Sequence, residues 1–179
     1  GKTYNFIQQA LVRYLLMIRT AKSEDASRIA EIYNYYIENT VVTFEEEMVS
    51  SNQISARLKK IEDSGLPWLV DQEGELVVGY AYASPWNERS AYKHTAEISV
   101  YLAHDSLGHG IGTRLYHVLF TELTKLSIKV VIGGIALPNP ASKSLHEKFG
   151  MRKVAHFEKV GFKFGQWIDV GYWQTELNT

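Results

Sequence analysis

Apolar side chains recur every three or four residues in three segments of the chain, which is the spacing of an amphipathic helix. The positions that set this spacing are Ala26, Ile29, Tyr33, Tyr36 and Ile37, then Ile54, Leu58 and Ile61, then Ile111, Leu115, Val118, Leu119 and Leu126. Ser23 is placed to cap the first helix, and Ser50 and Ser51 precede the second. A fourth helix is expected after Asn139 and Pro140, because asparagine caps helices and proline suits their first position.

Between these segments lie runs rich in β-branched and aromatic residues, which predict strands. The predicted strands are Ile18 to Thr20, Trp68 to Val70, Leu76 to Ala83, Thr95 to Leu102 and Lys129 to Leu137, with two more closing the chain. The second and third flank a turn-forming segment, Asp71 to Gly74, so they are expected to form an antiparallel hairpin. The order of elements predicts an α/β fold in which a mixed, mostly antiparallel sheet has helices on both sides.

Residues 18 to 177 contain no internal repeat, proline-rich linker or low-complexity stretch, so they are expected to form a single domain. Residues 1 to 17 begin with glycine and directly precede the first predicted strand, which suggests an N-terminal extension or an expression leader. Leu11, Leu15 and Leu16 fall near helical spacing there, but no small-residue cleavage site follows them. A signal peptide is therefore not favoured.

The composition narrows the possible functions. Nineteen lysines and arginines against twenty acidic residues leave a formal net charge of -1, so no broad basic surface for nucleic acid is expected. The chain has no cysteine, which excludes disulfides, thiolate metal sites and cysteine nucleophiles and favours the cytoplasm. The longest apolar run, Val130 to Leu137, is far shorter than the roughly 20 residues of a membrane span, so no membrane partner is expected. His104 and His109 have no spacing typical of a metal site, so no metal is predicted.

The glycines in the segment Leu107-Gly108-His109-Gly110-Ile111-Gly112 lie between a predicted strand and a predicted helix. A helix N-terminus presents free backbone N–H groups, and glycines allow a pyrophosphate to approach them closely. The spacing matches neither a Walker A motif nor a complete dinucleotide-binding fingerprint. Taken alone, the segment is equally compatible with a flexible turn.

The glycine loop at residues 108–112 lies between two further motifs. These are TAEISVYL at residues 95–102, and LPNPAS through LHEKFG at residues 137–150. In this order the three motifs resemble the GNAT superfamily of acetyl-CoA-dependent N-acetyltransferases. Closer resemblance to the phosphinothricin (glufosinate) and methionine sulfoximine N-acetyltransferases comes from PWNERSAY at residues 85–92, GFKFG at residues 161–165, and WIDVGYWQ at residues 167–174. The resemblance spans residues 18–177. It implies the GNAT acyl-CoA N-acyltransferase fold, acetyl-CoA as co-substrate, acetylation of the amino group of a small amino-acid analogue, herbicide resistance and a homodimer.

The resemblance also implies which residues hold acetyl-CoA. Val100, Tyr101 and Leu102 would lie along the pantetheine arm, with main-chain pairing at Val100 and Leu102. The pyrophosphate would be wrapped by Gly108, His109, Gly110, Ile111, Gly112 and Thr113. Family members usually carry arginine or glutamine where this chain has Leu107, a change that concerns affinity more than activity because the loop acts largely through backbone donors. The Asn139 amide would bond the cofactor arm or the substrate, a role compatible with capping its helix.

Acetyl transfer needs a neutral amine, so a base must remove a proton from an ammonium substrate. Glu97 is the candidate base, because a partly buried strand carboxylate has a raised pKa and the family's carboxylate falls at this position. The alternative for Glu97 is a carboxylate that faces solvent. His146, seven residues after Asn139, takes the place of the tyrosine thought to protonate the leaving thiolate in many GNAT enzymes. The acid and base roles of Glu97 and His146 stay open to exchange. The main-chain N–H of Val100 is the candidate donor to the tetrahedral oxyanion.

Arg89 is the candidate clamp for an acceptor carboxylate, since a guanidinium can donate two parallel hydrogen bonds. Tyr92 would wall the same pocket, and Phe44 and Lys163 are weaker candidates, with Phe44 equally suited to the core. The segment of residues 85–92 favours a small acidic acceptor over the alternatives, which are another small amine or a protein N-terminus. A non-catalytic acetyl-CoA sensor is a further alternative, disfavoured by the presence of both candidate catalytic residues.

Aromatic residues are dense near the C-terminus, at Phe157, Phe162, Phe164, Trp167, Tyr172 and Trp173. Alternation along two strands would place part of this set on the face away from the helices. An exposed apolar patch commonly marks an interface, which agrees with a homodimer. The alternative is that these side chains line the acceptor pocket.

Overall fold

A computed structural model describes residues 5–9 and 17–178 of the chain. Within these residues, seven strands form one sheet in the order β1-β2-β3-β4-β5-β7-β6, and of their pairings only β4–β5 is parallel. The strands are β1 (Ile18–Thr20), β2 (Trp68–Glu73), β3 (Leu76–Pro85), β4 (Thr95–Leu102), β5 (Val130–Ala136), β6 (Arg152–Lys163) and β7 (Gln166–Glu176). The helices are α2 (Ala26–Asn39), α3 (Ser51–Asp63), α4 (Ile111–Lys125) and α5 (Pro140–Lys148). The predicted mixed, mostly antiparallel α/β sheet is confirmed.

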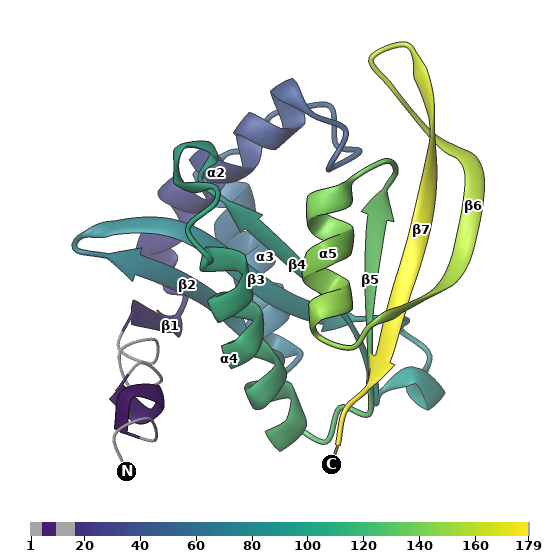
Figure 1. The fold of residues 1–179 in the computed structure, drawn as a ribbon. Coiled ribbons are helices and arrows are strands. Elements are labelled where there is room, and N and C mark those ends of the chain that lie inside the picture. The colour runs from purple at the N-terminus through teal and green to yellow at the C-terminus, as the bar shows by residue number, and fades with distance from the viewer. Residues whose placement is uncertain (1–4, 10–16, 179) are drawn as a thin grey trace.

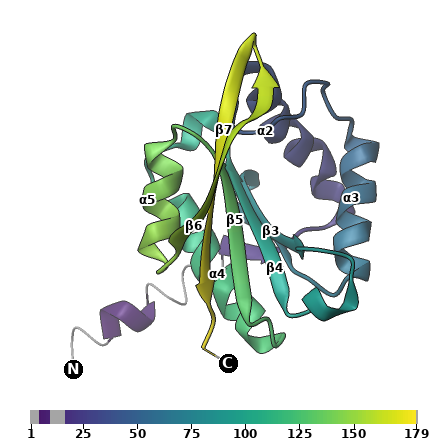
Figure 2. The same ribbon diagram turned by 90° about the vertical axis from the view of Figure 1, so that its right-hand side faces the viewer.

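Helices cover both faces of the sheet (Figures 1 and 2). On one face α2 and α3 bury a cluster that includes Ile37, Ile54 and Tyr80. On the other, α4 presents Leu115 and Leu119 to the sheet, both fully buried. The middle strands therefore have little contact with water, and a charged side chain placed on them loses much of its hydration.

Two of the predicted helix caps form as expected. The Ser50 hydroxyl accepts a hydrogen bond from the Gln53 N–H at 3.1 Å, at the start of α3. The side-chain oxygen of Asn139 accepts one from the Ser142 N–H at 3.1 Å, at the start of α5. In both helices the capping oxygen satisfies a backbone donor that has no partner within the helix.

The cap predicted at Ser23 is wrong. Ser23 begins a short 3-10 turn, and α2 starts only at Ala26. The carboxylate of Asp25 explains the difference, because it accepts a hydrogen bond from the Lys22 N–H at 2.8 Å and pairs with Arg19 at 2.8 Å. These contacts hold the chain in a tight turn before the helix begins.

The turn predicted at Asp71 to Gly74 is also shorter than expected, since β2 continues to Glu73. Asp71 is fully buried, and its carboxylate accepts a hydrogen bond from Arg114 of α4 at 2.5 Å. Arg114 also pairs with Glu73 at 2.5 Å. The strand is thus prolonged by an ion pair between Asp71 and a helical residue 43 positions later in the chain. At the other end of α4, the helix stops at Lys125 and leaves Leu126 exposed.

The sheet is split between its two parallel strands. Pairing of β4 with β5 covers Thr95, Ala96 and Glu97, opposite Val130 to Ile132. Beyond this point β4 stays paired with β3, whereas β5 stays paired with β7, so the two halves of the sheet diverge (Figure 1). Glu97 lies at the start of the split.

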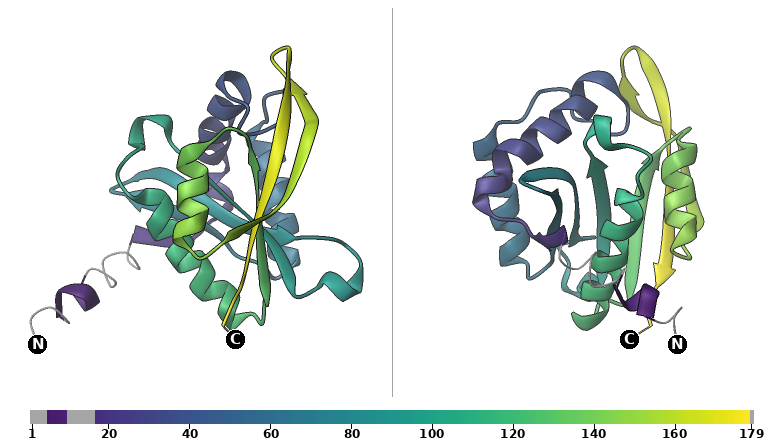
Figure 3. Two further views of the ribbon diagram at one scale, coloured as in Figure 1. Left: turned by 45° about the vertical axis from the view of Figure 1, so that its right-hand side comes forward. Right: turned by 60° about the vertical axis from the view of Figure 1, so that its left-hand side comes forward.

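The β6–β7 hairpin projects past the rest of the sheet on the side of α2 (Figures 2 and 3). Among residues 5–9 and 17–178, no helix combines the length and apolar character that crossing a membrane requires. The same residues contain no cluster of three or more histidine or acidic side chains suited to hold a metal ion. Leu11, Leu15 and Leu16, noted in the sequence of the N-terminal segment, lie outside the described residues.

Candidate active site

Glu97 lies on β4, opposite Ser84 of β3. Side chains alternate along β4, so Glu97 shares a face with Tyr101, which packs against the α2–α3 cluster. Burial alone raises the pKa of the Glu97 carboxyl above its ordinary value of 4.5, because the ionised form has lost part of its hydration. A carboxylate of this kind accepts a proton more readily than one in water, as a general base near neutral pH must do.

His146 lies on α5, on the opposite face of the sheet. It is 3% exposed, and its Nδ1 lies 2.7 Å from the main-chain oxygen of Ser142. A carbonyl oxygen only accepts hydrogen bonds, so Nδ1 carries the proton. Burial lowers the pKa of His146 below 6.5, which favours the neutral ring with Nε2 as an acceptor.

Tyr116 provides the partner of that acceptor. Its hydroxyl lies 3.2 Å from His146 Nε2, and its side chain is fully buried in α4. Burial is the main cause that raises the pKa of Tyr116, and the charges of Tyr82 and Glu97 add to it, so Glu97 lies within electrostatic range of the Tyr116 hydroxyl. Sequence reasoning missed Tyr116, because its helical spacing with Leu115, Leu119 and Leu123 is that of an ordinary core residue.

The main-chain groups of Val100 and Leu102 point into the split. The Ala103 N–H donates to Val78 of β3, and strand alternation turns the groups of Leu102 and Val100 the other way, where β5 has diverged. The Tyr36 hydroxyl donates to the Leu102 carbonyl at 2.5 Å. The Leu102 N–H and both main-chain groups of Val100 have no hydrogen-bond partner in the part of the chain that the structure describes. The Tyr101 ring points toward the α2–α3 face of the sheet, where it makes edge contacts with Tyr33 and Tyr36.

The glycine loop leads directly into α4. Gly108 and Gly110 have φ angles of 82° and 73°, in the left-handed region that favours glycine, and Gly110 is the N-cap of the helix. His109 and Leu107 are exposed, so the loop is accessible from solvent. Ile111, Gly112 and Thr113 form the first turn, whose backbone N–H groups lack partners within the helix. Lys148 of α5 reaches this turn, with its Nζ 3.4 Å from the Thr113 hydroxyl.

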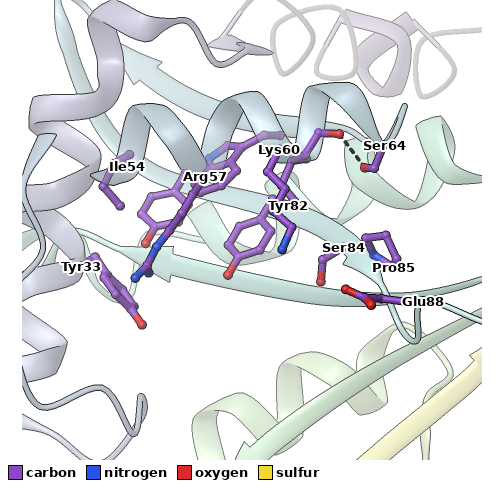
Figure 4. Close-up of a pocket in the computed structure, with 12 residues that line it drawn as sticks. Tyr33, Ile54, Arg57, Lys60, Ser64, Tyr82, Ser84, Pro85 and Glu88 are labelled. Carbon is purple, nitrogen blue, oxygen red and sulfur yellow. Dashed lines mark hydrogen bonds between the residues drawn. The ribbon is translucent and has the colours of Figure 1, made fainter. Parts of the chain in front are cut away.

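A cavity of about 380 Å³ lies on the α2–α3 face, between α3 and the β3 residues beside Glu97 (Figure 4). Its lining residues are Tyr33, Ile54, Arg57, Lys60, Ile61, Ser64, Trp68, Tyr80, Tyr82, Ser84, Pro85 and Glu88. The rings of Trp68 and Tyr82 stack 4.2 Å apart. We call this space the α3 pocket. It combines an aromatic wall with a small number of polar groups, which is typical of small-molecule sites.

Arg57 is already paired within this pocket. Its guanidinium donates to both oxygens of Glu45, at 2.6 and 2.8 Å, and Glu45 also accepts a hydrogen bond from the Tyr33 hydroxyl. Arg57, with Tyr33, holds the pKa of Glu45 below its ordinary value despite partial burial. The charge of Arg57 is therefore largely compensated.

Phe44 and Lys163 meet where the segment after α2 contacts the β6–β7 hairpin. Lys163 is 1% exposed and donates to the Thr43 carbonyl at 2.8 Å, and burial lowers its pKa. The Phe44 ring packs over Gly161, where an added Cβ would come within 2.4 Å of it. Both residues connect the β6–β7 hairpin to the segment that follows α2. Neither residue lines the α3 pocket.

Arg89 and Tyr92 lie in the exposed segment between β3 and β4. Arg89 lines a neighbouring hollow of about 460 Å³, which shares Ser64, Pro85 and Glu88 with the α3 pocket. Tyr92 lines neither space. The structure thus places Arg89 at the end of the α3 pocket marked by Glu88, outside its lining.

The C-terminal aromatic residues divide into two groups. Trp173 is 1% exposed in the core, and Tyr172 is partly covered by edge contacts with Trp86 and Phe157. Phe157, Phe162, Phe164 and Trp167 are more than half exposed, along the β6–β7 hairpin. These four residues, which we call the hairpin aromatic patch, do not line the α3 pocket.

Comparison with known proteins identifies the class to which this fold and site belong. Residues 18–171 match the family described as the acetyltransferase (GNAT) domain, and the chain belongs to this family of N-acetyltransferases. Among curated relatives, phosphinothricin N-acetyltransferase of Streptomyces viridochromogenes is 36% identical over 160 residues, covering 89% of this chain and 87% of the relative. L-methionine sulfoximine/L-methionine sulfone acetyltransferase of Salmonella typhimurium is 32% identical over 163 residues, covering 91% and 95%.

Solved structures support the same assignment. The phosphinothricin acetyltransferase of Sinorhizobium meliloti in complex with AcCoA is similar to this chain with a TM-score of 0.87 and 34% identity, covering 90% of this chain and 88% of the other. The ribosomal-protein-alanine N-acetyltransferase of Brucella melitensis has a TM-score of 0.87 and 34% identity, covering 89% and 99%. The names of these two proteins differ in their acceptors, so membership of the family does not by itself determine the acceptor.

Proposed function

We propose that this protein transfers the acetyl group of acetyl-CoA to the amino group of a small amino-acid analogue of the phosphinothricin or methionine sulfoximine type. The observation that carries the proposal is Glu97, a half-buried carboxylate at the split in the sheet and beside the α3 pocket. The names of the curated relatives support the same acceptors. With phosphinothricin as acceptor, the activity would confer resistance to that herbicide.

We place acetyl-CoA in the split itself, between the diverging ends of β4 and β5 and next to the N-terminus of α4. Val100 offers its main-chain groups there for the pantetheine arm and Leu102 offers its N–H, whereas the residues from Gly108 to Thr113 offer the N-terminus of α4 for the pyrophosphate. Asn139 uses its side-chain oxygen to cap α5, which leaves its amide nitrogen as a donor for the arm. No step of the proposed reaction is assigned to a metal.

The reaction divides between the two faces of the sheet. On the pocket side, Glu97 takes a proton from the acceptor ammonium, and the neutral nitrogen attacks the thioester carbonyl carbon. The Val100 N–H donates to the oxygen that becomes negative in the tetrahedral intermediate. On the other side, the carbon–sulfur bond breaks, the acceptor nitrogen loses its second proton as the amide forms, and the thiolate gains one proton. We assign the transfer of this proton from nitrogen to sulfur to the Tyr116–His146 pair on that face, where Nε2 of neutral His146 can accept a proton and release it again.

The α3 pocket supports a small acceptor over a protein N-terminus, because its cavity of about 380 Å³ is the size of a site for a small molecule. Assay of CoA release with phosphinothricin, methionine sulfone and an alanine-led peptide tests this. If the peptide is acetylated and the two small acceptors are not, the proposed acceptor class is wrong and the acceptor is a protein N-terminus. Binding of acetyl-CoA without CoA release from any acceptor would instead support a non-catalytic sensor.

We expect Gly110→Val to reduce strongly the rise in melting temperature that acetyl-CoA produces in the native protein. Valine is disfavoured at the φ of 73°, and its side chain would block close approach of the pyrophosphate. Gly65→Val is the matched control, because Gly65 has a φ of 76° and lies at the end of α3, away from the loop. If both variants keep the full acetyl-CoA shift, the glycine loop does not hold the pyrophosphate.

We also propose that the protein is a cytoplasmic homodimer that buries the hairpin aromatic patch. Phe162, Phe164 and Trp167 are 54%, 58% and 66% exposed, an unusual amount of aromatic surface for a free hairpin. Light scattering at micromolar concentration should give the mass of two chains. Phe162→Ser combined with Trp167→Ser should give one chain, and a native protein that is already monomeric contradicts the interface.

A further inference from the structure

The cations around the α3 pocket differ in whether they already have a partner. Arg57 is held by both oxygens of Glu45, and buried Lys163 donates to the Thr43 carbonyl outside the pocket. Lys60 lines the pocket, and its side-chain ammonium has no hydrogen-bond or ion-pair partner within the described ranges 5–9 and 17–178. Within the lining of the α3 pocket, Lys60 is thus the basic side chain whose charge is not compensated.

The placement of Lys60 is specific. Its side chain extends from α3 toward the strand that carries Tyr82 and Ser84, and the Glu88 carboxylate lies at the Ser84 end (Figure 4). Ser84 is also the residue directly opposite Glu97 in the sheet. The pocket therefore has the Glu88 carboxylate in its lining, Glu97 on the strand beside Ser84, and a cation reaching in from the helix.

This distribution of charge orients an amino-acid acceptor. Its ammonium is attracted to the end with Glu97 and Glu88, and an oxyanion on the same molecule is attracted to Lys60. We propose that Lys60 binds an acidic group of the acceptor and sets the preference for acceptors that carry one. The inference rests on the acetyl transfer proposed above and deepens it by naming a specificity residue.

Two acidic groups could be the partner of Lys60, the α-carboxylate or an anionic side-chain group such as a phosphinate. Arg89, at the entrance near Glu88, is the candidate clamp for the α-carboxylate. We therefore expect Lys60 to serve the side chain. Phosphinothricin carries both acidic groups and methionine sulfone only the carboxylate, so these two acceptors separate the possibilities.

The test is a comparison of KM and kcat for both acceptors in Lys60→Gln, Lys60→Arg and Lys59→Gln. Lys60→Gln should raise the KM for phosphinothricin about 10- to 100-fold and change kcat little, as expected for loss of a charge-assisted hydrogen bond. Lys60→Arg should restore most of the affinity. Lys59→Gln is the matched control, because Lys59 is adjacent on α3 but pairs with Asp63 at 2.6 Å and does not line the pocket.

A selective effect on phosphinothricin assigns Lys60 to the side-chain anion, and an equal effect on both acceptors assigns it to the α-carboxylate. Kinetics for both acceptors that match those of Lys59→Gln would overturn the proposal. Failure of the underlying function is distinguishable, because the native protein would then release no CoA with either acceptor. Lys60 is exposed, so we expect Lys60→Gln to leave folding unchanged, and a melting temperature equal to that of Lys59→Gln would verify this.

Discussion

Glu97→Gln is expected to lower kcat by about 10²- to 10⁴-fold while the affinity for acetyl-CoA stays nearly unchanged. The substitution removes the proton acceptor and keeps the shape of the side chain. Glu97 is on the face of the α3 pocket, and the proposed acetyl-CoA groups of Val100 and Leu102 point into the split, so cofactor binding should persist. Steady-state kinetics and an acetyl-CoA titration measure the two effects separately.

The pH dependence sharpens this prediction. The active form of Glu97 is the carboxylate, and burial raises its pKa above 4.5, so kcat/KM should rise as the pH increases through that raised pKa and then level off. The glutamine variant should lack this rise. Burial also makes the ionised carboxylate destabilising at neutral pH, so Glu97→Gln should melt at the same temperature as the native protein or higher.

Glu75→Gln is a suitable control, because Glu75 is exposed in the turn between β2 and β3, away from the site. It should leave kcat and the pH profile unchanged. A Glu97→Gln variant with native kcat would remove Glu97 from the role of base. A drop in kcat together with a lower melting temperature would point to a structural role instead.

Gly133→Ala is expected to reduce kcat about 100-fold, the typical effect of moving a catalytic group by about 1 Å. A Cβ at this position on β5 would lie 2.6 Å from Nε2 and 2.7 Å from Cδ2 of His146. The ring is buried and held through Nδ1 by the Ser142 carbonyl, so it can move aside only by giving up that bond or the one to Tyr116. The melting temperature should fall as well, because the overlap lies in the core.

Gly134→Ala is the control that distinguishes displacement of His146 from a general disturbance of β5. Gly134 is the next residue on the same strand and faces the other way, where its Cβ would approach Tyr172 at 3.0 Å. This variant should keep most of its kcat. Equal kcat in the two variants would show that the placement of His146 under β5 does not matter for the reaction.

The sequence by itself determined the elements whose signals are local. The spacing of Leu115 and Leu119 identifies α4, the oxygens of Ser50 and Asn139 start their helices, and the glycines at Gly108 and Gly110 lie where φ is positive. Each of these depends on residues a few positions apart. The order of the elements was sufficient for the fold class, and the quoted motifs were sufficient for the family, which the comparison confirms.

Tertiary structure decided every feature that depends on a distant partner. Asp71 extends β2 because Arg114 arrives from α4, and His146 is a neutral acceptor because Tyr116 and the Ser142 carbonyl bracket its ring. The sequence also could not show that Arg57 is compensated by Glu45 and that Lys60 is not. Charge pairing and burial are set by distances between side chains that only the folded chain brings together, and these distances determine the chemistry of the site.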